Sequence, residues 1–450
     1  MAPAPVTLEL GDVQGLVARG YGTLSAASFL LLGLEDGAAA RRWLAKALDS
    51  ITSGDERPDR KALNVAFTSE GLSRLGLSGE VVQQFSNEFV HGMTTAHRQR
   101  ILGDVGDSSP EHWDWGGPST APIGAVLMLY ARDAPELERL LEEQSRLLVE
   151  AGVEVQRKLD TSDLDGFEPF GFRDGISQPF VEGLSKAGPA GQTVRAGEFV
   201  LGYVNEHGHR TDEPLLEGPA AIGKNGSYLV FRQLEQDVRG FWRFIDASVP
   251  HPAERTRLAA KMVGRWPGGA ALALAPDRDD PALSEANEFG YFHEDPLGVR
   301  CPVGAHIRRT NPRDSLDPGP GTEKSLAINR RHRLLRRGRE YGQALSADAA
   351  LTESLAPDEA RGLHFICLNG NIARQFEFVQ NTWLNNPKFA GLYDDSDPLV
   401  GQSAPYGGTF TMPSESVRAR INGMPRFVRV RGGAYFFLPG LNALRHLASF

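Results

Sequence analysis

One histidine in this sequence stands among residues that would let a large ligand approach it. His306 follows Gly304 and Ala305, whose small side chains leave room for a bulky, flat partner. Three arginines follow closely, and their cations suit carboxylates or phosphates: Arg308, Arg309 and Arg313. A lone histidine is also common as a packing residue, but this context favours a planar, anion-bearing ligand held beside an imidazole.

A second candidate segment places an acid inside a glycine-rich turn. Asp174 lies between Gly171 and Gly175 in the run from Phe170 to Pro179. Glycine permits a tight turn, so Arg173 and Asp174 would be presented from a rigid loop. An Asp-Gly pair is also a frequent surface turn, so the spacing alone leaves a catalytic acid and an ordinary turn both open.

A third candidate segment is the arginine-rich run from Arg330 to Gly342, which also contains His332. Such a run can be an RNA-binding surface. Tyr341 is its only aromatic residue, and RNA-binding surfaces usually interleave aromatic with basic residues. The run therefore favours an anion-binding or catalytic arginine over a nucleic-acid surface.

The composition excludes several classes of protein. The 450 residues include 48 basic and 57 acidic side chains, and the net charge of −9 argues against charge-driven binding to nucleic acid or anionic membranes. Cys301 and Cys367 cannot form a disulfide framework or a cysteine-rich zinc site. The first residues lack the basic and apolar regions of a signal peptide, and the apolar runs are shorter than a membrane span. We expect a cytoplasmic protein with reduced thiols.

The elements that must position these residues repeat a strand–helix plan in both halves of the chain. Each half contains two apolar strands that are each followed by a helix with an apolar face, and one further strand. The predicted strands lie near 29–34, 63–67, 126–131, 228–232, 363–368 and 427–438, and the helices near 36–51, 135–150, 236–247 and 371–383. This order predicts an α+β fold of two ferredoxin-like domains, with antiparallel sheets and peripheral helices.

The predicted domain boundaries follow from this repeat. Residues 1–165 form the first domain, residues 166–219 a connecting segment with the Asp174 turn, and residues 220–450 the second domain. Residues 266–325, which contain His306, hold few periodic segments. Irregular loops of this length in a compact domain are usually functional.

The motifs together resemble those of the dye-decolorizing peroxidases, a family of haem enzymes, and the resemblance covers nearly the whole chain. The family's GxxDG signature is similar to Gly171-Phe-Arg-Asp-Gly175. Its proximal histidine motif is similar to Gly304-Ala-His-Ile-Arg-Arg, and its distal arginine motif to Arg336-Arg-Gly-Arg-Glu-Tyr-Gly342. The resemblance implies two ferredoxin-like domains, with one haem b held mainly by the second.

The resemblance also implies roles for individual residues. His306 would be the axial ligand of the haem iron, and Asp174 and Arg336 would be the distal acid and the distal arginine. Leu363 and Phe365 would narrow the access to iron, and Arg313 would clamp a haem propionate. Glu377 is our prediction for the carboxylate that accepts a proton from His306, and Asp397 is the alternative.

The implied function is a peroxidase that uses hydrogen peroxide to oxidise bulky aromatic donors such as dyes and phenols by one-electron steps through a ferryl-oxo intermediate. The alternative is a haem-binding carrier with little turnover, in which Asp174 and Arg336 would have no task. Neither nucleic acid nor membrane is an expected partner, and the sequence leaves monomer and dimer open.

Two features of the sequence bear on how large donors would be oxidised. Surface aromatic residues could relay electrons to a buried haem, and the candidates are Tyr341, Trp383, Tyr406 and Tyr435. The chain also departs from many relatives, which have Ile-Pro where Arg339 and Glu340 stand here. This departure adds charge beside the distal motif.

Overall fold

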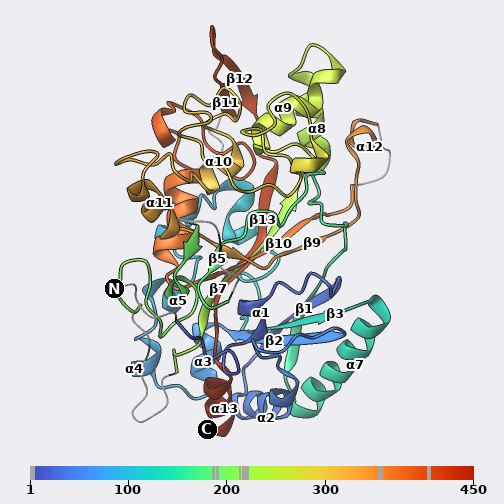
Figure 1. Cartoon of the computed structure of the whole chain (residues 1–450). Coiled ribbons are helices and arrows are strands. Elements are labelled where there is room, and N and C mark those ends of the chain that lie inside the picture. Colours follow the sequence, from blue (N-terminus) through green and yellow to red (C-terminus); the bar gives the residue numbers. More distant parts are fainter. Residues whose placement is uncertain are drawn as a thin grey trace.

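One nine-stranded sheet runs through the computed structural model, which describes residues 6–184, 188, 192–211, 214, 222–352, 358–402 and 407–450. Its strands follow the order β4-β1-β3-β2-β13-β7-β10-β8, and β9 pairs with β10 beside β8. All neighbouring strands of this sheet are antiparallel. In Figure 1 most of the first half, in blue to teal, lies below and most of the second half, in yellow to red, lies above, while the C-terminus returns to the bottom of the view.

The first half of the sheet has the ferredoxin-like order β4-β1-β3-β2. Its elements are β1 (Ala26–Gly33), α2 (Gly37–Ala47), β2 (Lys61–Phe67), β3 (Ala125–Ala131), α7 (Ala134–Ala151) and β4 (Glu154–Asp160). The helices begin where the sequence supplies caps, since Asp36 accepts from two amides of α2 and Asp133 accepts from the amide of Glu136 in α7. Gly152 ends α7 in the left-handed region, at φ 82°.

The second half repeats that order as β13-β7-β10 followed by β8 and β9. Its elements are β7 (Ser227–Gln236), α8 (Val238–Ala247), β8 (Leu335–Arg336), β9 (Arg339–Tyr341), β10 (Gly362–Asn369) and β13 (Val428–Leu438). After β10 the chain forms a wide helix with π-type hydrogen bonding, in the segments Ala373–Glu377 and Val379–Leu384. The predicted α+β fold with two ferredoxin-like halves is therefore confirmed.

The two halves share one sheet and one core. Phe67 of β2 pairs with Phe437 of β13, and one cluster of buried apolar side chains contains residues of both halves. The C-terminal helix α13 (Leu441–Ser449) packs against α2 of the first half. The boundary predicted at 219/220 falls outside the described residues, and the boundary at 165/166 remains a prediction.

The remaining helices are short and lie around the sheet. In the first half they are α1 (Gly15–Ala18), α3 (Ser69–Arg74), α4 (Gly79–Val82), α5 (Asn87–His91) and α6 (Ala96–Leu102). In the second half they are α9 (Arg255–Val263), α10 (His306–Thr310), α11 (Glu323–Arg330) and α12 (Ala347–Leu351). The strand pairs β5 (Phe180–Val181) with β6 (Thr193–Val194) and β11 (Gly408–Met412) with β12 (Ala419–Met424) lie outside the main sheet. No helix within the described ranges is both long and apolar enough to cross a membrane.

Candidate functional site

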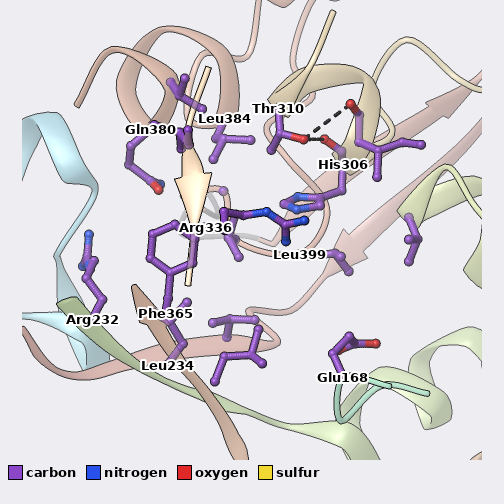
Figure 2. Close-up of a pocket in the computed structure, with 18 of the residues that line it drawn as sticks. Glu168, Arg232, Leu234, His306, Thr310, Arg336, Phe365, Gln380, Leu384 and Leu399 are labelled. Atoms are coloured by element: carbon purple, nitrogen blue, oxygen red, sulfur yellow. Dashed lines mark hydrogen bonds between the residues drawn. The ribbon is translucent and has the colours of Figure 1, made fainter. Parts of the chain in front are cut away.

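A cavity of about 290 Å³, lined mostly by residues C-terminal to 166, gathers most of the predicted site residues. The surface of its walls is mainly apolar, although nearly half of the lining residues carry polar or charged side chains. The predicted residues on its lining are Asp174, His306, Arg313, Arg336, Leu363 and Phe365. Figure 2 shows His306 and Arg336 directed toward the same space, with Phe365, Leu234 and Leu399 around it. A concave, mostly apolar pocket with a few convergent polar groups is the usual form of a ligand site.

His306 is the first residue of α10, in the long irregular segment predicted to be functional. Its Nδ1 lies 2.9 Å from Oδ2 of Asp397, whose other oxygen accepts hydrogen bonds from the amides of Leu399 and Val400. Burial acts to lower the pKa of His306, but the Asp397 carboxylate outweighs it, so the pKa lies above its usual value. Nε2 of His306 has no hydrogen-bonding partner among the described residues, which leaves it available to a ligand in the cavity.

The prediction that Glu377 is the partner of His306 is wrong. Glu377 is buried and accepts two hydrogen bonds from Nη1 of Arg98, at 2.7 and 2.8 Å. The hydroxyl of Tyr435 donates a third, at 2.8 Å. The helix that carries Glu377 turns this carboxylate toward α6 and β13, whereas the next segment, Val379–Leu384, packs against α10. The alternative residue, Asp397, occupies the predicted position.

Arg309 fastens α10 to the segment that carries Asp397. Its guanidinium is fully buried and donates to the backbone carbonyls of Gly304, Trp383, Asn386 and Asp395. Burial lowers its pKa to about 10, so it remains a cation at neutral pH. This arginine therefore connects the histidine helix to the loop that supplies its carboxylate, a role that the sequence did not indicate.

Asp174 and Arg336 form an ion pair on the cavity wall. Nη1 of Arg336 lies 2.8 Å from Oδ1 of Asp174, and the amide of Gly175 donates to the same oxygen at 2.6 Å. Burial acts to raise the pKa of Asp174, but the charge and hydrogen bond of Arg336 outweigh it, so the pKa lies below its usual value. Asp174 is therefore an ionised carboxylate at neutral pH.

Local backbone geometry explains why these two side chains meet. Gly171 and Gly175 take positive φ values of 96° and 80°, which glycine adopts without strain. Arg336 belongs to β8 and pairs with Cys367 of β10, and its amide donates to Oε1 of Gln178. The glycine turn and the short strand thus bring residues 162 positions apart into contact.

Two neighbouring arginines of the run, Arg337 and Arg339, are used inside the fold. Arg337 donates to the carbonyls of Leu16 and Val17, and Arg339 to those of Gly20 and Tyr21. Both side chains therefore hold the first half of the chain against the second. Because these guanidinium groups serve internal contacts, they do not form the exposed basic surface that an RNA-binding protein needs.

Arg313 and Arg333 add positive charge to the cavity wall. Arg313 lies 3.8 Å from the ring centre of Phe289 and donates to Asn287 and Phe289, while its Nε has no partner among the described residues. Burial lowers the pKa of Arg333 to about 9, and the charges of Arg313 and Arg336 contribute. No carboxylate pairs with Arg333 in the part of the chain that the structure describes. Arg333 belongs to the same arginine run as Arg336, but its place on the cavity wall was not among the predictions.

The remaining predicted residues divide between the cavity and the core. Leu363 and Phe365 point into the cavity from β10, whereas His364 between them contacts the ring of Tyr341 and the carbonyl of Asp160.

The aromatic residues that could relay electrons are mostly buried. Tyr341, Trp383 and Tyr435 are at most 9% exposed, so none of them presents a surface to a large donor. Tyr406 lies outside the described residues. Within those residues, no group of three or more acidic, histidine or cysteine side chains could hold a metal ion.

Comparisons with known proteins agree on one group of relatives. No family model matches the sequence. Peroxidase 2 from Mycetinis scorodonius is 30% identical, and the match covers 100% of this chain and 89% of that protein. The multifunctional dye peroxidase DyP2 from Amycolatopsis sp. is 33% identical over 86% of this chain and 82% of its own. The solved structure of a decolorizing peroxidase from Auricularia auricula-judae is 28% identical, with a TM-score of 0.82 over 98% of this chain and 100% of the other.

Proposed function

This chain belongs to the dye-decolorizing peroxidase family, and from that premise we propose that its cavity binds one haem b with His306 as the axial ligand. The enzyme is a peroxidase, and its proposed donors are bulky aromatic compounds such as dyes and phenols. A related structure, 28% identical, is a dye-decolorizing peroxidase in complex with 2,6-dimethoxyphenol. The single observation that carries the proposal is the meeting of His306, Asp174 and Arg336 in one apolar cavity.

The residues present suit haem in three respects. The cavity wall is mainly apolar, as a porphyrin requires. Nε2 of His306 has no partner among the described residues and is held in place through Nδ1. Arg333 and Arg313 offer cations without carboxylate partners, which suits the two propionates. When bound, haem would supply an iron that coordinates peroxide and exchanges electrons.

The His306–Asp397 pair would set the properties of the axial ligand. The ionised Asp397 keeps a proton on Nδ1, so that Nε2 presents its lone pair to the cavity. The same carboxylate makes the imidazole a stronger electron donor. Arg309 keeps Asp397 at this position by fastening its loop to α10.

The Asp174–Arg336 pair would handle the proton and the charge of peroxide cleavage. Asp174 is ionised at neutral pH, so its carboxylate can take a proton from the peroxide oxygen that would bind iron. It can then give that proton to the other peroxide oxygen, which leaves. Arg336 presents a fixed cation to the negative charge that develops on the leaving oxygen. A haem carrier would need neither group, so the pair favours the enzyme.

A haem titration tests the axial ligand. Haem added to the apoprotein should give a Soret band that saturates at one equivalent. His306→Ala should weaken binding and shift the band, and added imidazole should restore a histidine-type spectrum by entering the vacated position. An unchanged spectrum and affinity in His306→Ala would remove this residue from the site.

A further inference from the structure

The loop that carries Asp174 folds around the carboxyl group of Glu168. Oε1 of Glu168 accepts from the amide of Phe172 at 2.9 Å, and Oε2 accepts from the amide of Phe170 at 3.0 Å. Gln236, on β7, donates to Oε2 at 2.8 Å. A single side chain therefore binds two amides of the loop and connects the loop to the central sheet.

Backbone contacts extend this arrangement to Asp174. The amide of Glu168 donates to the carbonyl of Phe172, and the amide of Gly171 to the carbonyl of Glu168. The amide of Asp174 donates to the carbonyl of Gly166 at 2.9 Å. Glu168 also lines the cavity (Figure 2). The two acids belong to one closed turn, so a change at Glu168 alters the support of Asp174.

We propose that Glu168 is a positioning residue, which holds the 166–174 loop closed and thereby keeps Asp174 against Arg336. The role of Asp174 rests on the proposed function, but the closing of the loop by Glu168 does not. No atom of Glu168 needs to touch peroxide. Its effect passes through the amides of Phe170 and Phe172 and through Gln236.

The surroundings of Glu168 make this support dependent on pH. Burial raises the pKa of Glu168 to about 7, while its hydrogen bonds from Gln236, Phe170 and Phe172 oppose the rise and the charge of Asp174 adds to it. An opened loop would expose the carboxyl, which would return to its ordinary pKa near 4.5. The closed loop therefore binds the proton more tightly. The proton on Glu168 therefore stabilises the closed loop fully below about pH 4.5, and this stabilisation is lost as the pH rises to about 7.

Amide hydrogen exchange tests the proposal on the folded chain with or without haem. In the parent protein, protection of the Phe170 and Phe172 amides, corrected for intrinsic exchange, should fall as pH rises from about 4.5 to 7. Glu168→Ala should lower this protection about tenfold or more at every pH, because the two amides lose their acceptor. Glu168→Gln should remove the pH dependence, since its side chain does not titrate.

Peroxide kinetics of the haem-loaded protein provide the functional arm. Glu168→Ala should slow the reaction with peroxide while haem affinity stays within about twofold, and Glu168→Asp should recover part of the rate. The matched control is Glu138→Gln, which removes one exposed charge on α7 and should change neither measurement. Parental exchange at Phe170 and Phe172 in both Glu168→Ala and Glu168→Gln would overturn the proposal. If the Glu168 variants show the expected change in exchange but the haem-loaded parent protein does not react with peroxide, the proposed function is refuted and the role of Glu168 in the loop stands.

Discussion

Two hydrogen-bonded pairs of side chains give the cavity its chemical character. In the Asp397–His306 pair the carboxylate fixes the imidazole, and in the Asp174–Arg336 pair the guanidinium fixes the carboxylate. The resemblance of three local motifs to those of the family pointed to His306, Asp174 and Arg336, and the structure places all three on one cavity. The sequence could not decide between Glu377 and Asp397, because the partner of a histidine is set by packing between distant segments. The role of Arg309 and the place of Arg333 on the cavity wall were not predicted, because both depend on packing between distant segments.

The arginine run offers a matched test of a single side chain. Arg336→Leu should slow the reaction with peroxide by about 10²–10³, because the developing charge loses its aligned donor. Arg337→Leu should keep that rate within a few-fold but lower thermal stability, since the carbonyls of Leu16 and Val17 lose their partner. Stopped-flow absorbance and calorimetry measure the two effects. Equal slowing in both variants would mean that the run acts only as a diffuse positive field.

Asp174 should impose an acidic limit on peroxide cleavage. Its pKa lies below the ordinary value of 3.8, so the carboxylate stays ionised across the neutral range and is protonated only in strong acid. With respect to this group, the rate constant for the reaction with peroxide should stay constant across the neutral range and fall only in strong acid. Stopped-flow measurements should show that Asp174→Asn reacts slowly with peroxide at every pH, without the fall in rate at acidic pH. Parental rates in this variant would show that another group carries the proton.

At the scale of elements, the helix after β10 shows where sequence patterns lose accuracy. The pattern predicts a regular helix from 371 to about 383, and a helix is present from Ala373 to Leu384. Its π-type hydrogen bonding changes the angle between successive side chains, so a face assigned with the ordinary period is displaced. Glu377 consequently meets Arg98 and Tyr435 instead of α10.

Variants of the two carboxylates separate these packing environments. Asp397→Asn should lower haem affinity or peroxidase activity about 10–100-fold, because the axial histidine loses its hydrogen-bonding carboxylate. Glu377→Gln should leave the haem spectrum unchanged and lower thermal stability, since Arg98 loses its ionic partner. Haem titration and thermal melts distinguish the two. A spectral change in Glu377→Gln alone would reverse the assignment.

The whole molecule consists of two ferredoxin-like halves whose strands form a single sheet. The sequence predicted the duplicated order because each half repeats strand and helix patterns of the same kind. It did not predict that β2 and β13 would join the halves, or that α13 would return to pack on α2. Such contacts depend on pairing between residues far apart in the chain.

This continuity predicts cooperative unfolding. Both halves contribute to one apolar core, so neither half should remain folded when the other melts. Calorimetry of the apoprotein should show one unfolding transition. Spectroscopic probes placed in either half should report the same midpoint temperature. Two separated transitions would mean that the shared strand pair and core couple the halves only weakly.

Stopped-flow spectroscopy tests whether His306, Asp174 and Arg336 make this cavity a peroxidase site. Haem-loaded protein mixed with hydrogen peroxide should lose its resting Soret band within seconds, and an aromatic donor such as 2,6-dimethoxyphenol should then restore it. Asp174→Asn/Arg336→Leu should bind haem but react with peroxide at least about a hundredfold more slowly. A resting spectrum that peroxide leaves unchanged, or a double variant that reacts at the parental rate, would contradict the account.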